Sequence, residues 1–406
     1  MAFLNDLSNG KKMVDKVFKA AVKAREAKAK FGDENVVDAT LGTLFDENGT
    51  FVAFDNVWGP YEKIDKIQKA KYASSIQGNP GYRDAVYKWL FGNEEMNCEI
   101  VVTPGGAGAV SSTMHNILNP GQTVIKPSQG WGPYKTMANE FGLNITSYNL
   151  FKDNKFDIDD FKKTLTDVMS KEGKVLVIIN DPCHNPTGYT MKPSEWDEVI
   201  LFVNDLSKQG PVVILNDIAY VDYSLNPTWK DHFLKYRNLS ENVMAIIAFS
   251  LSKTFTAYGA RIGAAVAITN NMSELEKFKD ATIYSARSIW STANNSVMEL
   301  FDMISNDETL YRNYINEKQT YIELLRERAQ IFITEASEVG LELYPFTEGF
   351  FATLRVTDNA EKEALNLKLQ ENNIFTVEVD GGLRIALCSV PKRKLKGLAQ
   401  KIKNIM

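Results

Sequence analysis

Residues 245–253 read AIIAFSLSK, in which the apolar run 245–249 leads directly into Ser250-Leu251-Ser252-Lys253. Unbroken apolar runs of this kind, rather than alternating ones, are typical of parallel strands covered on both faces. Similar runs occur at 123–125 (TVI), 175–179 (VLVII) and 212–215 (VVIL). Helix-like segments such as 193–206 lie between them. This order predicts right-handed crossovers and a doubly wound, mostly parallel sheet of the α/β class.

Three of these runs end in polar residues. The run 175–179 leads to Asn180-Asp181, the run 212–215 leads to Asn216-Asp217, and the run 245–249 leads to Lys253 within four residues. In open parallel sheets, ligands bind just beyond the carboxyl ends of the strands. We therefore expect Asp217 and Lys253 to converge on one edge of the sheet.

The pattern changes after about residue 300. A long charged helical pattern covers 308–336, and alternating segments follow at 349–354 and 382–387. These features predict a smaller α+β domain. An amphipathic N-terminal helix is expected to join it, since chain ends often lie close together. Its apolar side chains recur at helical spacing: Val14, Val17, Phe18, Ala21 and Val22.

The chain has 406 residues, more than one hydrophobic core normally supports. We expect residues 1–50 and 300–406 to form the small domain and residues 51–299 the large one. The net charge of -5 argues weakly against a nucleic-acid partner, and three cysteines with three histidines make a metal centre improbable. Neither a signal peptide nor about 18 unbroken apolar residues occurs, so we expect no membrane partner and a cytoplasmic location.

Lys253 and Arg261 form the central chemical motif. A lysine amine that is desolvated, or close to other cations, can form a Schiff base with an aldehyde. Ser250 supplies a hydroxyl and Arg261 a planar cation, and both groups suit a phosphate. Taken alone, Lys253 would more often be a solvated lysine at a strand end, with Arg261 in an ordinary salt bridge.

Two motifs follow the neighbouring strands. Two prolines and a glycine make 180–188 (NDPCHNPTG) a rigid turn, which holds Asn185 where its amide can donate. The alternative is a plain Asn-Pro turn. Asp217, three residues before Tyr220, would be costly to bury without a cation, and a pyridinium nitrogen is such a cation. The alternative for Asp217 is a helix N-cap.

A glycine-rich segment supplies a candidate phosphate seat. Residues 103–110 (TPGGAGAV) place small residues ahead of a helix, which exposes backbone N–H groups and the positive end of the helix dipole. Glycine-rich turns are frequent, so this signal is weak by itself. Trp131 could stack on a flat ring, or it could equally be a core residue.

Together these motifs resemble the class I aminotransferases of pyridoxal-5′-phosphate (PLP) fold type I, the aspartate and aromatic aminotransferase family. The resemblance runs from about Val37 to Leu387 and depends on HNPTG at 184–188, Ser-x-Ser-Lys at 250–253 and Arg261 eight residues further on. It implies a seven-stranded sheet, PLP as the cofactor and a ping-pong Schiff-base mechanism. The amino group would move from an L-amino acid (aspartate, glutamate or aromatic) to a 2-oxo acid.

The resemblance also implies residue roles. Lys253 carries the cofactor as a Schiff base and moves the proton, and Arg384 clamps the substrate α-carboxylate. The implied cofactor-binding residues are Gly106, Ala107, Trp131, Asn185, Asp217, Tyr220, Ser250, Lys253, Arg261 and, from a partner subunit, Tyr72. The implied substrate-binding residues are Gly42, Asn185, Arg287 and Arg384.

Some positions depart from the family or leave alternatives open. Ala107 replaces a common hydroxyl residue, and Tyr134 stands where aspartate-specific members usually have histidine near the ring-pairing aspartate. Arg287 either reads a substrate side-chain carboxylate across a dimer interface or is an interfacial arginine with no substrate role. Because Tyr72 and Arg287 would act across an interface, we expect a homodimer.

Fold alone does not determine function. The first alternative is a PLP-dependent carbon–sulfur β-lyase on the same scaffold. The second, less favoured, is a PLP-binding regulatory module without catalytic activity. Release of pyruvate and ammonia would identify the lyase, and failure of every half-reaction would identify the module.

Overall fold

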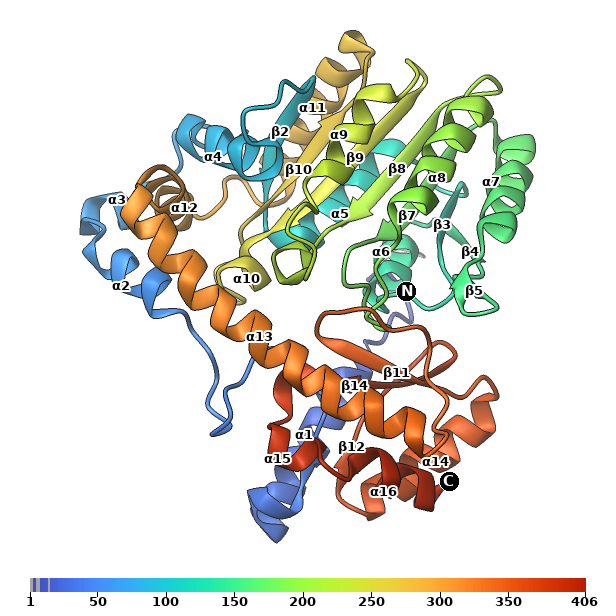
Figure 1. The fold of residues 1–406 in the computed structure, drawn as a ribbon. Coiled ribbons are helices and arrows are strands. Elements are labelled where there is room, and N and C mark those ends of the chain that lie inside the picture. The colour runs from blue at the N-terminus through green and yellow to red at the C-terminus, as the bar shows by residue number, and fades with distance from the viewer. Residues whose placement is uncertain (1–2, 5–7, 14) are drawn as a thin grey trace.

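The computed structural model describes residues 3–4, 8–13 and 15–406 and contains a central seven-stranded sheet (Figure 1). Strand β10 is antiparallel to both of its neighbours, and the other four strand pairs are parallel. The sheet thus has the mostly parallel form that the unbroken apolar runs predicted. Its order is β2 (Cys98–Thr103), β10 (Gly263–Ile268), β9 (Val243–Ser250), β8 (Val212–Asp217), β7 (Val175–Asn180), β3 (Thr123–Pro127) and β4 (Asn144–Tyr148).

Helices cover both faces of this sheet, which explains why its strands are apolar without alternation. In β8, Val212 and Ile214 belong to one apolar core, while Val213 and Leu215 belong to another. The first core includes residues of α4 (Pro80–Phe91), α7 (Ile158–Glu172), α8 (Pro193–Leu206) and α12 (Asn295–Asn306). The second includes residues of α5 (Gly105–Ile117), α6 (Pro133–Glu140) and α11 (Met272–Ile289).

A second, smaller unit has its own core and combines helices with a small, mainly antiparallel sheet, which agrees with the predicted α+β class. Its three-stranded sheet has the order β11 (Phe351–Arg355), β14 (Gly382–Ala386), β13 (Val377–Val379). A short parallel pair joins β1 (Val37–Asp38) to β12 (Ile374–Phe375). The helices of this unit are α14 (Asn359–Glu371), α15 (Lys392–Leu395) and α16 (Leu398–Ile405).

Helix α13 (Glu308–Glu338) runs from one unit to the other (Figure 1). Its residues Tyr314 and Ile322 belong to the core of the large unit, and Phe332 and Ala336 belong to the core of the small one. The helix therefore serves both cores. We propose that the boundaries between the large and the small domain lie near residues 50 and 300.

The N-terminal helix joins the small unit, but with a different face from the predicted one. Helix α1 (Lys16–Phe31) buries Ala20, Ala21, Ala24 and Ala27, whereas Phe18 is 70% exposed and Val22 is 48% exposed. The small alanines let the helix lie close to β12 and β13, and this close approach decides the buried face. The prediction that Phe18 and Val22 face the core is wrong, and Val14 lies outside the described residues.

The remaining helices are short: α2 (Asp55–Lys63), α3 (Lys66–Ala70), α9 (Asp231–Leu234) and α10 (Leu251–Thr254). Strands β5 (Phe151–Lys152) and β6 (Lys155–Phe156) form a hairpin. Within the described residues, no helix combines the length and the apolar character that crossing a membrane requires.

Candidate active site

A cavity of about 190 Å³ lies at the carboxyl ends of β7, β8 and β9, next to the start of α5. This is the edge at which an open parallel sheet binds ligands. Both Asp217 and Lys253 line it, as their positions after adjacent strands predicted. The full lining is Gly106, Ala107, Trp131, Asn180, Asn185, Asp217, Ala219, Tyr220, Ser250, Ser252, Lys253, Tyr258 and Arg261.

Lys253 lies in the single turn of α10 that follows β9, and Ser250 caps this turn by accepting from the Ser252 backbone N–H at 3.2 Å. The Lys253 Nζ donates to the Gly42 carbonyl oxygen at 2.8 Å and lies 4.4 Å from the centre of the Tyr258 ring. Burial lowers the pKa of Lys253 to about 8, because the charged amine loses hydration. A substantial fraction of this amine is therefore neutral near pH 8 and able to attack an aldehyde.

Asp217 is the last residue of β8 and is buried. Its Oδ2 accepts from the Tyr134 hydroxyl at 2.6 Å, and its Oδ1 accepts from the Ala219 backbone N–H at 3.1 Å. Burial raises the pKa of Asp217, these two hydrogen bonds oppose the rise, and no cation of the described chain offsets it. A positively charged ring nitrogen in the cavity would supply the missing counter-charge.

The start of α5 and Arg261 form a pole of positive charge. Gly105 has φ +74°, and a Cβ at this position would lie 2.6 Å from Arg261 Nη2, so the close approach requires glycine. Arg261 donates only to neutral oxygens, those of Ser252, Tyr258 and Pro104, within the described chain. An unpaired guanidinium beside a helix N-terminus suits a phosphate dianion.

Asn185 connects the cavity to the small unit. Its Nδ2 donates to the Tyr220 hydroxyl at 3.4 Å, and its Oδ1 accepts from Arg384 Nη1 at 3.3 Å. The turn that carries it is held by Asn180, whose Oδ1 accepts from the Asn185 backbone N–H at 2.7 Å. The Asn180 Nδ2 donates to the Asp217 carbonyl oxygen at 2.7 Å. Asn180 therefore fixes two walls of the cavity relative to each other.

Arg384 lies on β14 and its side chain is buried. No acidic side chain of the described residues forms a salt bridge with it. Its Nη2 donates to the Thr40 carbonyl oxygen at 2.8 Å, its Cζ lies 4.3 Å from the centre of the Phe351 ring, and its Nε has no hydrogen-bond partner. A buried guanidinium with unused donors is a strong candidate for binding a carboxylate. Gly42 and Arg384 are thus both attached to the cavity by hydrogen bonds.

Four predicted residues do not line the cavity of the single chain: Gly42 and Arg384, which hydrogen-bond to the lining residues Lys253 and Asn185, and Tyr72 and Arg287. Tyr72 follows α3 and is 84% exposed. Arg287, near the end of α11, is exposed and donates to Ser291 Oγ at 2.7 Å. Trp131 does line the cavity, and its ring packs edge-on against the ring of Tyr134, with 5.4 Å between the ring centres.

Four lining residues were missed from the sequence: Asn180, Ala219, Ser252 and Tyr258. Asn180 could have been identified, because it directly follows the apolar run 175–179, much as Asp217 follows the run 212–215. Ala219 contributes its backbone N–H, which no side-chain pattern reports, and Ser252 contributes the hydroxyl that accepts from Arg261. Tyr258 lies in an irregular loop, where neither strand nor helix periodicity applies.

A buried amine and a buried carboxylate in one cavity, with an unpaired arginine at a helix N-terminus, define a Schiff-base enzyme of α/β type that holds a phosphorylated cofactor. Comparison with known proteins gives the family. The model described as "Aminotransferase class I and II" matches residues 42–402. The chain therefore belongs to the class I and II aminotransferases. It is a PLP-dependent aminotransferase.

Individual relatives agree with this membership. An aminotransferase from Anaerococcus prevotii has a solved structure with a TM-score of 0.95 and 31% identity, covering 100% of this chain and 99% of that one. The aspartate aminotransferase of Haemophilus influenzae is 23% identical over 76% of this chain and 78% of its own length. The tyrosine aminotransferase of Rhizobium meliloti is 25% identical over 79% of this chain and 84% of its own.

Proposed function

We propose that this enzyme transfers the amino group of an acidic or aromatic L-amino acid to a 2-oxo acid, with Lys253 as the catalytic residue. The proposal depends on one observation: the Lys253 amine and the buried Asp217 carboxylate, which has no cation partner among the described residues, line the same cavity. Burial lowers the pKa of Lys253 to about 8, so part of the amine is neutral at that pH. Asn185 also lines the cavity, and its Oδ1 accepts a hydrogen bond from the buried guanidinium of Arg384.

Bound PLP supplies an aldehyde that condenses with amines and a ring that withdraws electrons from the reacting carbon. Asp217 would hold the positive charge on the ring nitrogen, and the Tyr134 hydroxyl keeps that carboxylate oriented. Trp131 would pack against the ring, and Asn185 with Tyr220 would bind its phenolic oxygen. Gly106, Ala107, Ser250 and Arg261 would hold the phosphate.

With PLP bound, Lys253 Nζ would take the proton from the substrate α-carbon as general base and then give it up as general acid. Its depressed pKa suits both steps near neutral pH. The Gly42 carbonyl oxygen accepts a hydrogen bond from Lys253 Nζ at 2.8 Å. Arg384 and Asn185 orient the α-carboxylate so that the α-proton faces Lys253.

We place the active form as a homodimer in the cytoplasm, in which Tyr72 of each subunit reaches the phosphate of the other and Arg287 reads an acidic substrate side chain. The exposure of both residues in the single chain supports this arrangement. The substrate range draws on relatives named as aspartate, tyrosine and aromatic-amino-acid aminotransferases.

A donor screen with 2-oxoglutarate as acceptor tests the proposal. Loss of the PLP absorption band should occur with acidic or aromatic donors, and the wild-type enzyme should release one 2-oxo acid for each amino group transferred. Lys253→Ala should retain PLP and lose turnover, with Lys171→Ala, an exposed lysine of α7, as the matched control. Turnover by Lys253→Ala at the wild-type rate would contradict the assignment. Release of pyruvate and ammonia without amino transfer would favour the β-lyase instead.

A further inference from the structure

Arg384 is held by groups that themselves need support. Its two terminal nitrogens donate to the carbonyl oxygen of Thr40 and the amide oxygen of Asn185, and Phe351 packs against its face. Asn185 belongs to the large unit and has its own support from Asn180. Thr40 lies two residues after the end of β1. Its carbonyl oxygen can accept from Arg384 only if the backbone at this position is fixed.

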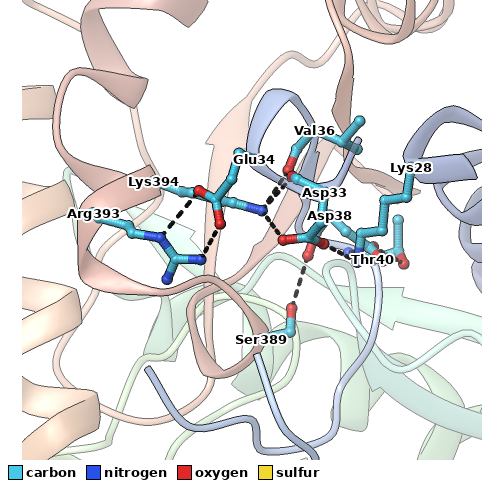
Figure 2. A network of polar contacts seen from close by, with 9 residues as sticks. All are labelled: Lys28, Asp33, Glu34, Val36, Asp38, Thr40, Ser389, Arg393 and Lys394. Carbon is cyan, nitrogen blue, oxygen red and sulfur yellow. Dashed lines mark hydrogen bonds and ion pairs between the residues drawn. The ribbon is translucent and has the colours of Figure 1, made fainter. Parts of the chain in front are cut away.

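Asp38 fixes that backbone. Its Oδ1 accepts both the Thr40 hydroxyl at 2.6 Å and the Thr40 backbone N–H at 3.3 Å (Figure 2). Its Oδ2 pairs with Lys28 Nζ at 3.0 Å, and its own carbonyl oxygen accepts from Ser389 Oγ at 3.1 Å. A carboxylate that accepts from the residue two positions ahead locks the intervening turn.

The same turn is also attached to the strand that carries Arg384. The Ala386 backbone N–H of β14 donates to the Ala39 carbonyl oxygen at 3.0 Å, and the Ala39 N–H donates to the Phe375 carbonyl oxygen at 2.9 Å. Thr40 is completely buried, so its hydroxyl has no water to replace Asp38 as acceptor. Asp38 therefore adds the side-chain contacts that hold Thr40, whose carbonyl oxygen accepts from Arg384.

We propose that Asp38 is a positioning residue for substrate carboxylate binding, acting through Thr40 on the Arg384 guanidinium. This inference rests on the proposed role of Arg384. Because the amino acid and the 2-oxo acid both carry a carboxylate next to the reacting carbon, Asp38 governs the affinity for both substrates equally. It leaves the proton transfer at Lys253 unchanged once a substrate is bound.

The test uses single-turnover half-reactions of the PLP-loaded enzyme, followed by cofactor absorbance, in both directions. In Asp38→Ala, the apparent Kd of donor and acceptor should rise by the same factor of about tenfold, with the maximum rate within about twofold of wild type. Thr40→Val should raise the apparent Kd of donor and of acceptor by about threefold, whereas Thr40→Ser, which keeps the hydroxyl, should have wild-type Kd values. Glu34→Gln, an acid-to-amide change at an exposed pair with Arg393 in the same network, should change neither constant.

Three results would overturn the inference: unchanged Kd values in Asp38→Ala, a rise for one substrate alone, or a fall in maximum rate at constant Kd. Arg384→Lys separates this failure from that of the proposed function. If Arg384→Lys leaves both Kd values unchanged, the role of Arg384 itself is wrong. If it raises them, Asp38→Ala should add nothing in the double variant. Should Asp38→Ala fail to fold or to hold PLP, the pair Thr40→Val and Thr40→Ser decides the question.

Discussion

Replacing Tyr134 by phenylalanine removes a single buried hydrogen bond at the base of the site. The Tyr134 hydroxyl donates to Asp217 Oδ2 at 2.6 Å, and both side chains are buried. A hydrogen bond to a charged group contributes about 1.5–3 kcal/mol. If Asp217 must stay ionised to hold the cofactor ring nitrogen protonated, a loss of about 2 kcal/mol lowers kcat about thirtyfold at neutral pH.

The pH dependence of Tyr134→Phe has a definite sign. Burial raises the pKa of Asp217, and the bond from Tyr134 opposes that rise by stabilising the charged form. Removing the bond raises the pKa further, so the carboxylate is protonated over a wider range on the acidic side. The acidic limb of the kcat profile should therefore move to higher pH, and the deficit relative to wild type should shrink as pH rises.

The assay is the pH profile of the single-turnover half-reaction, with Tyr148→Phe as the matched control. Tyr148 is also buried, but its hydroxyl donates to the Ile178 carbonyl oxygen at 3.2 Å. This variant should lose about 1 kcal/mol of stability and keep the wild-type profile. A Tyr134→Phe enzyme with wild-type kcat and an unmoved acidic limb would refute the reasoning about Asp217.

Four further outcomes are expected. The rate at which apoenzyme condenses with PLP should rise with pH through a midpoint of about 8, because the neutral Lys253 amine is the nucleophile; stopped-flow absorbance measures it. Arg287→Ala should raise KM for dicarboxylic donors and leave aromatic donors unchanged in a steady-state comparison. In the proposed homodimer, Tyr72→Phe should weaken PLP binding, measured by equilibrium dialysis. Gly188→Ala should cost about 3 kcal/mol in urea unfolding, because φ is +75° and the new Cβ would lie 2.4 Å from Phe346.

The part of the site that could be predicted from the sequence is the part built by neighbouring strands. Asp217 and Lys253 each follow an apolar run, and parallel strands bring such ends together whatever their separation along the chain. The N-terminal helix shows where this kind of reasoning fails. Helical spacing located α1, but the spacing of Phe18 and Val22 could not reveal that the buried face of this helix consists of alanines.

The carboxylate side of the site is harder to predict because its contacts join the two ends of the chain. Arg384 and Thr40 are 344 positions apart, and Arg384 and Asn185 are 199 apart. No local pattern marks Thr40, because it contributes a backbone carbonyl oxygen. In the sequence, Asp38 cannot be distinguished from an ordinary surface acid, and its ion pair with Lys28 is seen only in the structure.

The groups proposed to bind the cofactor and those proposed to bind the substrate carboxylate lie in different parts of the structure. The groups proposed to hold PLP lie on the large unit and are fixed to one another, as the two hydrogen bonds of Asn180 across β7 and β8 illustrate. The groups proposed to hold the substrate carboxylate meet at the junction of the two units, where Arg384 and Gly42 contact Asn185 and Lys253. A small displacement of one unit would therefore alter substrate binding while leaving the cofactor seat intact. It follows that substitutions at Asp38 and Thr40 should act on substrate affinity, whereas substitutions around Asp217 should act on the chemistry.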